Sequence, residues 1–486
     1  MKNKKAKIIL VIIILVIIQL TLLYLYFKDD IKISKNTTTT ASLENVEVSY
    51  ESYELSNEIG SYIAKVALSD EGITVDGNGV TVKDNIITIT KAGTYYITET
   101  ISDASIQIKC KEDGNVQLVL DNVNITSKTT APINGIKADN LIITLAEGSV
   151  NYLTDSENCT VFTNEDEQEP DETLFTKTDL VINGNGKLVI DSNYQDGIVS
   201  KDTLKIINAE IEITSADDGI RGKDFVAINN AKITIEATKK GIRSTNTKDS
   251  SLGYILIDGG TININKSYEG IEARLIEING ETVNITASDD GINASDGSST
   301  EGMMGQNVNS NVGIIINCGE IYINATGDGI DSNGSVYING GKTVIAGPTS
   351  DGDSSLDYDG VCVMNGGELI CYGSTGMWQS IGTNSTVYEI VFYNSGNSGD
   401  EITVKDSNGS EIASFETTKK YSGVGIASDK IENGETYTLY VNGEETAPIT
   451  VTGTVTANGS NQKSGNQMNY RNTKNFHIWV KFFVAK

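Results

Sequence analysis

The sequence predicts an all-β fold, a right-handed parallel β-helix with three strands in each coil of about 22 residues. Three observations lead to this prediction. A Gly-Ile pair recurs along the chain, short runs of alternating apolar and polar residues follow each pair, and no stretch after residue 27 has a convincing helical period. A leucine-rich horseshoe fits less well, because the asparagine and leucine positions of that repeat are missing.

The Gly-Ile pair sets the period of the repeat. From Gly197 onward, consecutive glycines lie 22, 22, 29, 21, 38 and 31 residues apart, and the last of them belongs to a degenerate D-G-V. The longer intervals contain polar insertions at 245–252 and 296–311, which leaves a base unit of 21–22 residues. The glycines of the repeat are Gly135, Gly197, Gly219, Gly241, Gly270, Gly291, Gly329 and Gly360.

The runs between the turns have the pattern of half-buried strands. Residues 225–237 read F-V-A-I-N-N-A-K-I-T-I-E-A, with alternating apolar residues and asparagines at the break. One such coil cannot bury its apolar face alone, but coils stacked about 4.8 Å apart can. The second residue after each Ile is small, as at Ala138, Ser200 and Gly222, which predicts a tight corner packed inward in every coil.

The chain begins with a segment of the membrane-spanning type. Four lysines within residues 2–7 precede the 20 uncharged residues 8–27, which would reach about 30 Å as a helix. We expect residues 1–27 to be an uncleaved signal anchor with its lysines in the cytoplasm. The rest of the chain then lies on the extracellular face of a bacterial cell membrane. A cleaved signal peptide is the alternative, although no A-x-A-like site follows.

The remaining boundaries follow from changes in composition. Residues 28–57 predict a polar spacer, and residues 58–384 predict the parallel β-helix, which opens with atypical coils. Within it, an acidic stretch at 154–177 predicts an exposed loop. Residues 385–452 predict a C-terminal cap of β-strands, and residues 453–486 predict a disordered tail.

Composition excludes several classes of function. The formal net charge of -28 at pH 7 argues against a nucleic-acid partner and favours divalent cations. His477 is the only histidine, which argues against histidine catalysis and His-ligated metals. The cysteines fit no zinc motif, and we expect them to be unpaired, buried thiols. They are Cys110, Cys159, Cys318, Cys362 and Cys371.

A column of acidic residues is expected beside the repeated glycines. When coils stack in register, the residue before each glycine lies above its counterpart, and two of these turns carry a second aspartate. Carboxylates about 5 Å apart repel by about 3 kcal/mol, so the column needs counter-charge. Calcium binds carboxylate oxygens at about 2.3–2.6 Å and can bridge two coils. The predicted calcium ligands are Asp196, Asp217, Asp218, Asp289, Asp290 and Asp328.

Two interpretations of this column stay open. In the first, calcium binds in two separate groups of coils, with Asp331 close to the second group, and the ammonium of Lys240 replaces the ion between them. In the second, an aspartate before glycine is ordinary turn chemistry and needs no metal. The doubled aspartates favour calcium, because a turn needs only one.

Basic and aromatic residues near the column predict a strip that binds polysaccharide. Arginine and lysine at the first and third positions after Ile should point outward, and arginine makes bidentate contacts with the carboxylates of an acidic glycan. Tyrosines shortly before their glycines would give sugars an amphipathic edge. The alternative is that these charges are only solvated. The predicted residues are Arg221, Arg243, Lys201, Lys223, Tyr194 and Tyr268.

The repeat units resemble a bacterial family. D-D-G-I-R-G-K around Gly219, G-I-R-S-T-N, Y-I-L-I-D-G-G-T-I-N-I and D-D-G-I-N-A are similar to the clostridial cell-surface carbohydrate-binding β-helix family, whose folds look like those of family 9 pectate lyases. The resemblance runs from about residue 65 to 452. It implies calcium at the coil-turn aspartates and binding of cellulose and of acidic sugars such as polygalacturonate. The chain departs from the family at Lys240 and Glu269, where Asp is usual.

Together these features predict calcium-dependent binding of polysaccharide at the cell surface, without catalysis. One alternative is a pectate-lyase-like enzyme in which Lys240 abstracts a proton next to a uronate carboxylate that calcium has acidified. Flanking carboxylates would raise the pKa of this lysine and make it a poor base. The other alternative is a structural or adhesive surface protein without a sugar ligand. The oligomeric state stays open.

Overall fold

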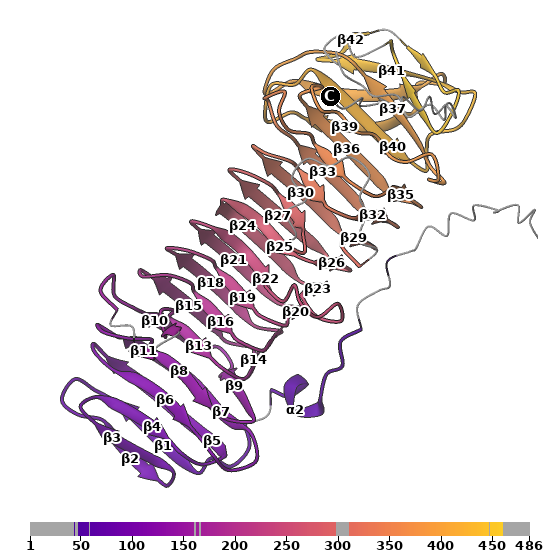
Figure 1. Cartoon of the computed structure of the whole chain (residues 1–486). Helices are drawn as coiled ribbons and strands as arrows, with labels where there is room; N and C mark the ends of the chain where they lie inside the picture. The colour runs from indigo at the N-terminus through magenta and orange to yellow at the C-terminus, as the bar shows by residue number, and fades with distance from the viewer. Residues whose placement is uncertain are drawn as a thin grey trace, which may run out of the picture. The chain divides into compact units, whose positions relative to one another are not determined.

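The described chain consists of strands stacked in long ladders. The computed structural model describes residues 43, 47–57, 59–159, 162–164, 167–297, 311–446 and 448–459. In these residues the only α-helix is α2 (Ser52–Leu55). Most strands pair in parallel with strands of the neighbouring coils (Figure 1). The structure therefore confirms the predicted all-β class and a solenoid of the β-helix type.

The first sheet contains the Gly-Ile turns and holds twelve strands. It opens with one antiparallel pair, β3 and β4, and is parallel from β4 onward. In register along it, Ile220 pairs with Ile198 on one side and Ile242 on the other. Its strands are β3 (Val80–Lys83), β4 (Ile86–Ile89), β6 (Ser105–Lys109), β8 (Ile133–Lys137), β13 (Leu174–Thr176), β16 (Ile198–Ser200), β19 (Ile220–Gly222), β22 (Lys240–Ser244), β25 (Glu269–Ala273), β28 (Ile292–Ala294), β31 (Ile330–Ser332) and β34 (Leu356–Tyr358).

The second sheet holds 25 strands. Through its middle, each strand pairs in parallel with the strand three places further along the chain. Its strands are β1 (Ala64–Leu68), β2 (Thr74–Gly77), β5 (Gly93–Ile101), β7 (Val116–Thr126), β9 (Asn140–Leu145), β10 (Val150–Thr154), β14 (Asp179–Gly184), β15 (Lys187–Ser192), β17 (Thr203–Ile207), β18 (Glu210–Ser215), β20 (Phe225–Asn229), β21 (Lys232–Ala237), β23 (Tyr254–Asp258), β24 (Thr261–Ser267), β26 (Leu275–Ile278), β27 (Thr282–Ala287), β29 (Gly313–Ile316), β30 (Glu320–Ala325), β32 (Ser335–Ile338), β33 (Lys342–Ala346), β35 (Cys362–Met364), β36 (Glu368–Gly373), β37 (Tyr388–Phe392), β40 (Gly423–Ser428) and β44 (Val455–Ala457).

Alternation along the strands fills the interior of the solenoid. In β21, Ile233 and Ile235 are fully buried, while Lys232 and Glu236 at the strand's other positions are exposed. The next coil repeats the pattern, since Ile233 pairs in register with Ile262. β-Branched side chains fit a pleated surface well, so these isoleucine columns form one continuous core.

The repeated glycines lie above one another, as predicted from their spacing. A Cβ atom on Gly219 would lie 2.7 Å from the carbonyl oxygen of Gly241 and 2.7 Å from Cγ2 of Ile235. The same close approach recurs where a Cβ on Gly197 would meet the carbonyl oxygen of Gly219 at 2.7 Å. Glycine is therefore required because a neighbouring backbone occupies the space that a side chain would need.

We expect Gly219→Ala to destabilise the protein by about 1–3 kcal/mol, because the added methyl group overpacks the coil corner. The midpoint of urea unfolding measures the effect. Gly60→Ala is the matched control, since nothing lies within 4 Å of its added Cβ. Equal midpoints for the two variants would contradict the packing of this corner.

Residues 43 and 47–57 lie against part of the second sheet (Figure 1). Helix α2 contacts β14, and Leu43 lies beside β26 and β29. This segment lies within the range predicted as a polar spacer. Leu43 packs on Leu275 and Ile315, and the Lys205 ammonium lies 2.8 Å from Oε1 of Glu54. The outward positions of this sheet include apolar side chains, so the segment keeps them from water.

The acidic stretch 154–177 is not simply an exposed loop. Residues 162–164 (β11) and 167–169 (β12) pair as a two-stranded sheet, but Leu174–Thr176 form β13 of the first sheet. Glu172 is 1 % exposed. The prediction was wrong for 172–176, because this coil carries E-T-L where other coils carry D-G-I and therefore escaped the repeat.

A separate five-stranded antiparallel sheet forms near the C-terminal end of the described chain. Its strands are β38 (Glu401–Asp406), β39 (Glu411–Glu416), β41 (Thr436–Val441), β42 (Glu444–Glu445) and β43 (Ile449–Thr450). The segment between β39 and β40 reaches back to the solenoid, where the Lys419 ammonium donates to the carbonyl oxygens of Ala346 at 3.1 Å and Gly347 at 3.2 Å. Strand β44 pairs with β37 and lies inside the range predicted as a disordered tail.

The cysteines are free thiols, as predicted, but not all are buried. Cys110, Cys362 and Cys371 are buried, whereas Cys318 is exposed. Cys318 follows the apolar strand β29 at a turn, where its Sγ contacts the carbonyl oxygen of Asn279 at 3.2 Å. Position relative to the strand end, and not the apolar run itself, decides its exposure.

The predicted membrane anchor, residues 8–27, lies outside the described residues. Within the described part of the chain, none of the helical structure has the length and apolar character needed to cross a bilayer. Of the predicted tail, residues 460–486 also lie outside the described residues.

The buried carboxyl group of Glu389, near the C-terminal end, should make the stability of the fold depend on pH. Burial raises the pKa of Glu389 to about 7 from 4.5, although the backbone N–H of Ile381 donates to its Oε2 at 2.8 Å and opposes the rise. Between these two pH values the folded state holds a proton that the unfolded state has lost, so stability falls as pH rises from 4.5 to 7. The fall from this group is at most about 3 kcal/mol.

Glu389→Gln should therefore remove this part of the pH dependence and stabilise the protein above pH 7. The measurement is the free energy of unfolding of both proteins between pH 4.5 and 8, because other carboxyl groups contribute equally to both slopes. Parallel curves for wild type and variant would show that Glu389 ionises normally in the folded state.

Candidate functional site

Successive coils place the residues before the repeated glycines in one column. The backbone N–H of Gly197 donates to the carbonyl oxygen of Asp218 at 2.9 Å, and that of Gly291 donates to Asp328 at 2.9 Å. This confirms the predicted register of the turns. The column runs through Glu172, Asp196, Asp218, Lys240, Glu269, Asp290 and Asp328.

Each aspartate in this column also ties its coil to the next one. Oδ1 of Asp196 accepts the N–H of Asp218 at 2.9 Å, and Oδ1 of Asp218 accepts the N–H of Lys240 at 3.0 Å. The contact recurs further along, where Oδ1 of Asp290 accepts the N–H of Asp328 at 2.8 Å. The role of these aspartates in the turn thus accounts for one oxygen of each carboxylate. The charge on the other oxygen needs a separate positive group nearby.

In the first group of coils, arginines supply that counter-charge. Nε of Arg221 donates to Oδ2 of Asp196 at 2.8 Å, and its Nη2 donates to Oε1 of buried Glu172 at 3.1 Å. Nη1 of Arg243 lies 3.6 Å from Oδ2 of Asp218. Burial raises the pKa of Asp196, and the charge of Arg221 opposes the rise. A guanidinium therefore already contacts the oxygen that a calcium ion would need.

An ion pair closes the middle of the column. Nζ of Lys240 lies 2.5 Å from Oε1 of Glu269 and 3.2 Å from Oε2 of Glu272. Burial opposes the charge on Lys240, but the hydrogen bond and attraction from Glu269 and then from Glu272 outweigh it and raise its pKa. Lys240 thus supplies positive charge between the two groups of aspartates, as the sequence interpretation expects.

The second group of acids, Asp290, Asp328 and Asp331, has no basic side chain in the described residues to balance its negative charge. Asp290, Asp328 and Asp331 are half-buried, and an oxygen of each lies within 4.8 Å of the others. Burial first, and then the charges of Asp290 and Asp328, raise the pKa of Asp331 to about 8. Burial likewise raises the pKa of Asp290 to about 7 and that of Asp328 to about 6. Among the described residues, no lysine or arginine forms an ion pair with this group.

The donor chemistry decides which group fits a divalent cation. Carboxylate oxygens are the ligands that calcium prefers, and in the second group they converge without a cationic neighbour. In the first group, Arg221 contacts Asp196, and Nζ of Lys239 lies 3.3 Å from Oδ1 of Asp217. Oxygens of the predicted ligands Asp196, Asp217 and Asp218 also lie within 4.8 Å of one another, but Arg221 and Lys239 already neutralise two of them, so this site suits the ion less well than the second group does. Of the other predicted ligands, Asp290 and Asp328 belong to the second group, and Asp289 adjoins it in a further set with Glu269 and Asp290.

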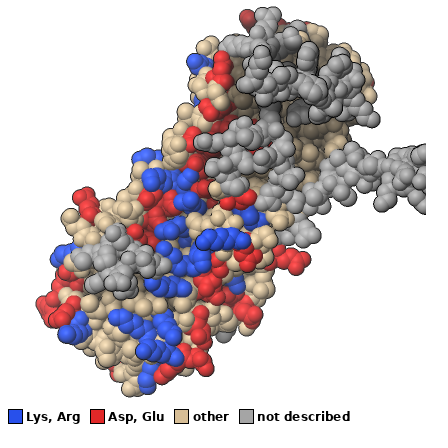
Figure 2. Space-filling view, in the orientation of Figure 1, with Lys and Arg blue, Asp and Glu red and all other residues tan. Residues whose placement is uncertain are grey.

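A polar cleft of about 290 Å³ opens over the first group of coils. On the face that Figure 2 shows, basic and acidic side chains are interleaved over the middle coils. Because the cleft combines cationic and carboxylate groups, it suits a ligand with both acidic and hydroxyl groups. Its lining residues are Asp171, Gln195, Asp196, Asp217, Asp218, Arg221, Lys239, Lys240 and Arg243.

Only part of the predicted carbohydrate strip gathers in this cleft. Arg221 and Arg243 line it. Tyr268 is 45 % exposed and adjoins the cleft, because Nζ of Lys240 lies 5.7 Å from the centre of its ring. Lys201 instead lies over the Phe175 ring, 5.9 Å from its centre. The predicted residues that do not contribute to the described lining are Lys201, Lys223, Tyr194 and Tyr268.

Sequence reasoning missed three contributors, and each left a weak signal. Glu172 occupies the column position in a coil without Gly-Ile, where only the order acid, small residue, aliphatic residue is kept. Lys239 stands one residue before Lys240, where another turn has its doubled aspartate. Asp357 pairs in register with Asp331 at the first position after the aliphatic residue.

Comparisons of the sequence find a matching family model and a similar protein with the same description. A family model described as carbohydrate-binding domain-containing protein matches residues 83–353. A carbohydrate-binding domain-containing protein of Acetivibrio thermocellus is 40 % identical over 222 residues, which cover 45 % of this chain and 77 % of that protein.

A solved structure, described as the polysaccharide lyase-like protein from C. thermocellum, gadolinium derivative, is 26 % identical. The match covers 62 % of this chain and 96 % of that chain with a TM-score of 0.42, which is too low to carry over details of fold or site. The family assignment rests on the sequence matches, and by them the chain belongs to the family of carbohydrate-binding domain-containing proteins.

Proposed function

We propose that the chain binds polysaccharide in a calcium-dependent manner, without catalysis, on the extracellular face of a bacterial cell membrane. Its family and its relative from Acetivibrio thermocellus are both described as carbohydrate-binding. The proposal includes a right-handed β-helix with three strands per coil, similar to family 9 pectate lyases, and a membrane anchor at residues 1–27.

One observation carries the proposal. Asp290 and Asp328 of the column and Asp331 beside them are half-buried and bring carboxylate oxygens within 4.8 Å of one another, without a lysine or arginine partner in the described chain. Three such groups repel each other unless a cation lies between them or protons neutralise them, as their raised pKa values reflect. Calcium would relieve the repulsion, and its 6–8 coordination positions would leave some for ligand oxygens.

An acidic glycan such as polygalacturonate fits this arrangement better than a neutral one. Its carboxylates could complete the coordination of the ion on the second group of acids. Two coils before Asp290, Arg243 has a side chain 36 % exposed and lines the cleft. A charged sugar could therefore meet an ion in one coil and a guanidinium in another.

The state of Lys240 supports binding over lyase chemistry. A general base must give up its proton near the operating pH. The two glutamates that contact Lys240 raise its pKa, and both acceptors hold its ammonium in place. This lysine is therefore badly suited to abstract a proton from a uronate.

Affinity electrophoresis of the full chain in detergent, in gels with and without polygalacturonate, tests the proposal. With calcium we expect the polymer to retard the protein, and with chelator we expect the retardation to disappear. Mobility that no acidic or neutral glycan changes would favour the structural or adhesive role.

The lyase alternative has its own measurement. Incubation with polygalacturonate and calcium should give no growth in the absorbance of unsaturated product. Steady growth that Lys240→Ala abolishes would replace the binding proposal with an enzymatic one.

A further inference from the structure

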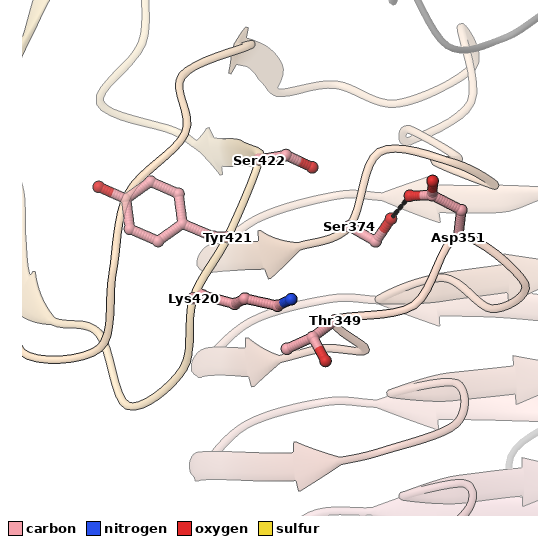
Figure 3. Close-up of a pocket in the computed structure, with 6 residues that line it drawn as sticks. All are labelled: Thr349, Asp351, Ser374, Lys420, Tyr421 and Ser422. Carbon is pink, nitrogen blue, oxygen red and sulfur yellow. Dashed lines mark hydrogen bonds between the residues drawn. The ribbon is translucent and has the colours of Figure 1, made fainter.

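A second cleft lies further along the solenoid, between the coils of β33 to β36 and the segment just before β40 (Figure 3). One wall is the connection between β33 and β34, which replaces the short Asp-Gly turn of earlier coils. The other wall is the segment Lys420–Ser422, just before β40. The cleft has a volume of about 150 Å³, less than the roughly 300 Å³ of the smallest drug-sized pockets, so it suits one small ring. Its lining residues are Thr349, Asp351, Ser374, Lys420, Tyr421 and Ser422.

Hydrogen bonds fix the coil side of the cleft. Oγ of Ser374 donates to Oδ1 of Asp351 at 2.5 Å and accepts the backbone N–H of Gly376 at 3.1 Å. Ser374 is buried, so it holds the carboxylate of Asp351 at the rim of the cleft. This wall is therefore organised before any ligand arrives.

The cap side is fixed in a similar way. The backbone N–H and carbonyl of Tyr421 both pair with Gly396, and its hydroxyl donates to Oδ2 of Asp400 at 3.2 Å. Oγ of Ser422 accepts the N–H of Thr375 at 3.1 Å, which joins the cap to the coil. Between these anchors, the exposed side chain of Lys420 extends toward the coil wall with Thr349 and Asp351 (Figure 3).

The chemistry of the lining selects a class of ligand. A carboxylate accepts hydrogen bonds from two neighbouring hydroxyl groups, and an ammonium donates three. The remaining lining residues are Thr349, Ser374 and Ser422, which carry hydroxyl groups, and Tyr421. Vicinal hydroxyls of a pyranose ring match this set, whereas an apolar ligand would offer neither the carboxylate nor the ammonium a hydrogen bond.

The charge of the surroundings disfavours an acidic sugar in this cleft. Asp351 lies in its wall, and Asp353 on the same loop is close enough to Asp328 to contribute to its raised pKa. The ammonium of Lys420 lines the cleft opposite Asp351, whereas that of neighbouring Lys419 is held by the backbone carbonyl oxygens of Ala346 and Gly347. The carboxylate of a uronate placed beside Asp351 would be repelled by it unless calcium were present.

We propose that this cleft is a metal-independent subsite for a single uncharged pyranose unit, separate from the calcium site and next to it along the edge. Asp351 accepts from two ring hydroxyls and Lys420 donates to a third. The proposal rests on the proposed carbohydrate binding for the class of ligand, but it needs no calcium. It implies that the glycan carries neutral sugars beside acidic ones.

Saturation-transfer NMR on the full chain in detergent with excess EDTA tests this subsite. The probes are methyl β-glucopyranoside, methyl β-galactopyranoside and the sodium salt of methyl galactopyranosiduronic acid. We expect transfer to a neutral glycoside and none to the uronate. Asp351→Ala and Lys420→Met should each weaken binding about tenfold or more, since each removes hydrogen bonds to a charged group.

Asp331→Asn is the matched control, because it alters the proposed calcium site and should leave the transfer unchanged. Unchanged melting of Lys420→Met shows that the exposed side chain is not needed for folding. Transfer to neither neutral glycoside, or transfer that survives both cleft substitutions, overturns the subsite. Loss of polygalacturonate retardation with intact transfer would instead overturn the calcium proposal alone.

Discussion

Asp331→Asn is expected to abolish the stabilisation of this protein by calcium. In the wild type, calcium at a hundredfold excess over its Kd should add about 2.7 kcal/mol to the free energy of unfolding, because the ion binds only the folded state. Asp331 is the member of its group that burial and neighbouring charges perturb most, with a pKa raised to about 8. The asparagine that replaces it keeps one side-chain oxygen but lacks the negative charge that attracts the ion.

The same variant should behave in the opposite way without metal. With chelator, Asp331 must either carry a charge that burial and its acidic neighbours disfavour or take up a proton. The amide avoids both costs, so Asp331→Asn should be more stable than the wild type. Thermal melting with calcium and with chelator measures both effects. The matched control is Asp217→Asn, whose parent carboxylate has Lys239 as a partner at 3.3 Å and should leave the calcium response unchanged. A wild type that melts at one temperature under both conditions would refute this prediction.

Arg221→Ala is expected to destabilise the protein by about 3–5 kcal/mol. The guanidinium is the shared partner of two buried carboxyl groups, with Nε 2.8 Å from Asp196 and Nη2 3.1 Å from Glu172. Its removal leaves negative charge inside the fold without compensation. Urea unfolding gives the change in stability.

Two further variants separate this charge effect from a simple loss of packing. Adding Glu172→Gln and Asp196→Asn to Arg221→Ala should recover most of the lost stability, because the orphaned charges are then gone. Lys223→Ala should cost at most about 0.5 kcal/mol, since Lys223 is exposed and lies 3.8 Å from Asp224. Equal losses for Arg221→Ala and the triple variant would mean that packing, and not charge, explains the effect.

The fold could be predicted largely from the repeat. A glycine every 21–22 residues, with alternating runs between, leaves few arrangements other than stacked coils, and the structure places Gly197, Gly219 and Gly241 in contact as that argument requires. Where a coil lacked the motif, the prediction failed, as at Glu172, just before strand β13. The packing of Leu43 on Leu275 also could not be predicted, because the sequence does not indicate which distant surface an apolar residue in a polar stretch will cover.

The candidate site was predictable in position but not in chemistry. The spacing of the turns locates the acidic column, and Lys240 was expected to act as an internal counter-ion. However, Asp218 and Asp290 look alike in sequence, and only the structure shows that Arg243 reaches one while the other has acids for neighbours. That difference depends on which outward residue lies one coil away, and the Arg221–Glu172 contact spans residues 49 apart in the chain.

A crystal of the protein grown with calcium tests the central claim most directly. The account predicts a strong density peak about 2.3–2.6 Å from carboxylate oxygens of Asp290, Asp328 and Asp331, and none beside Asp196, where Arg221 contacts the carboxylate. A calcium ion beside Asp196 with Arg221 displaced, or an ordered second group of acids without any ion, would contradict it.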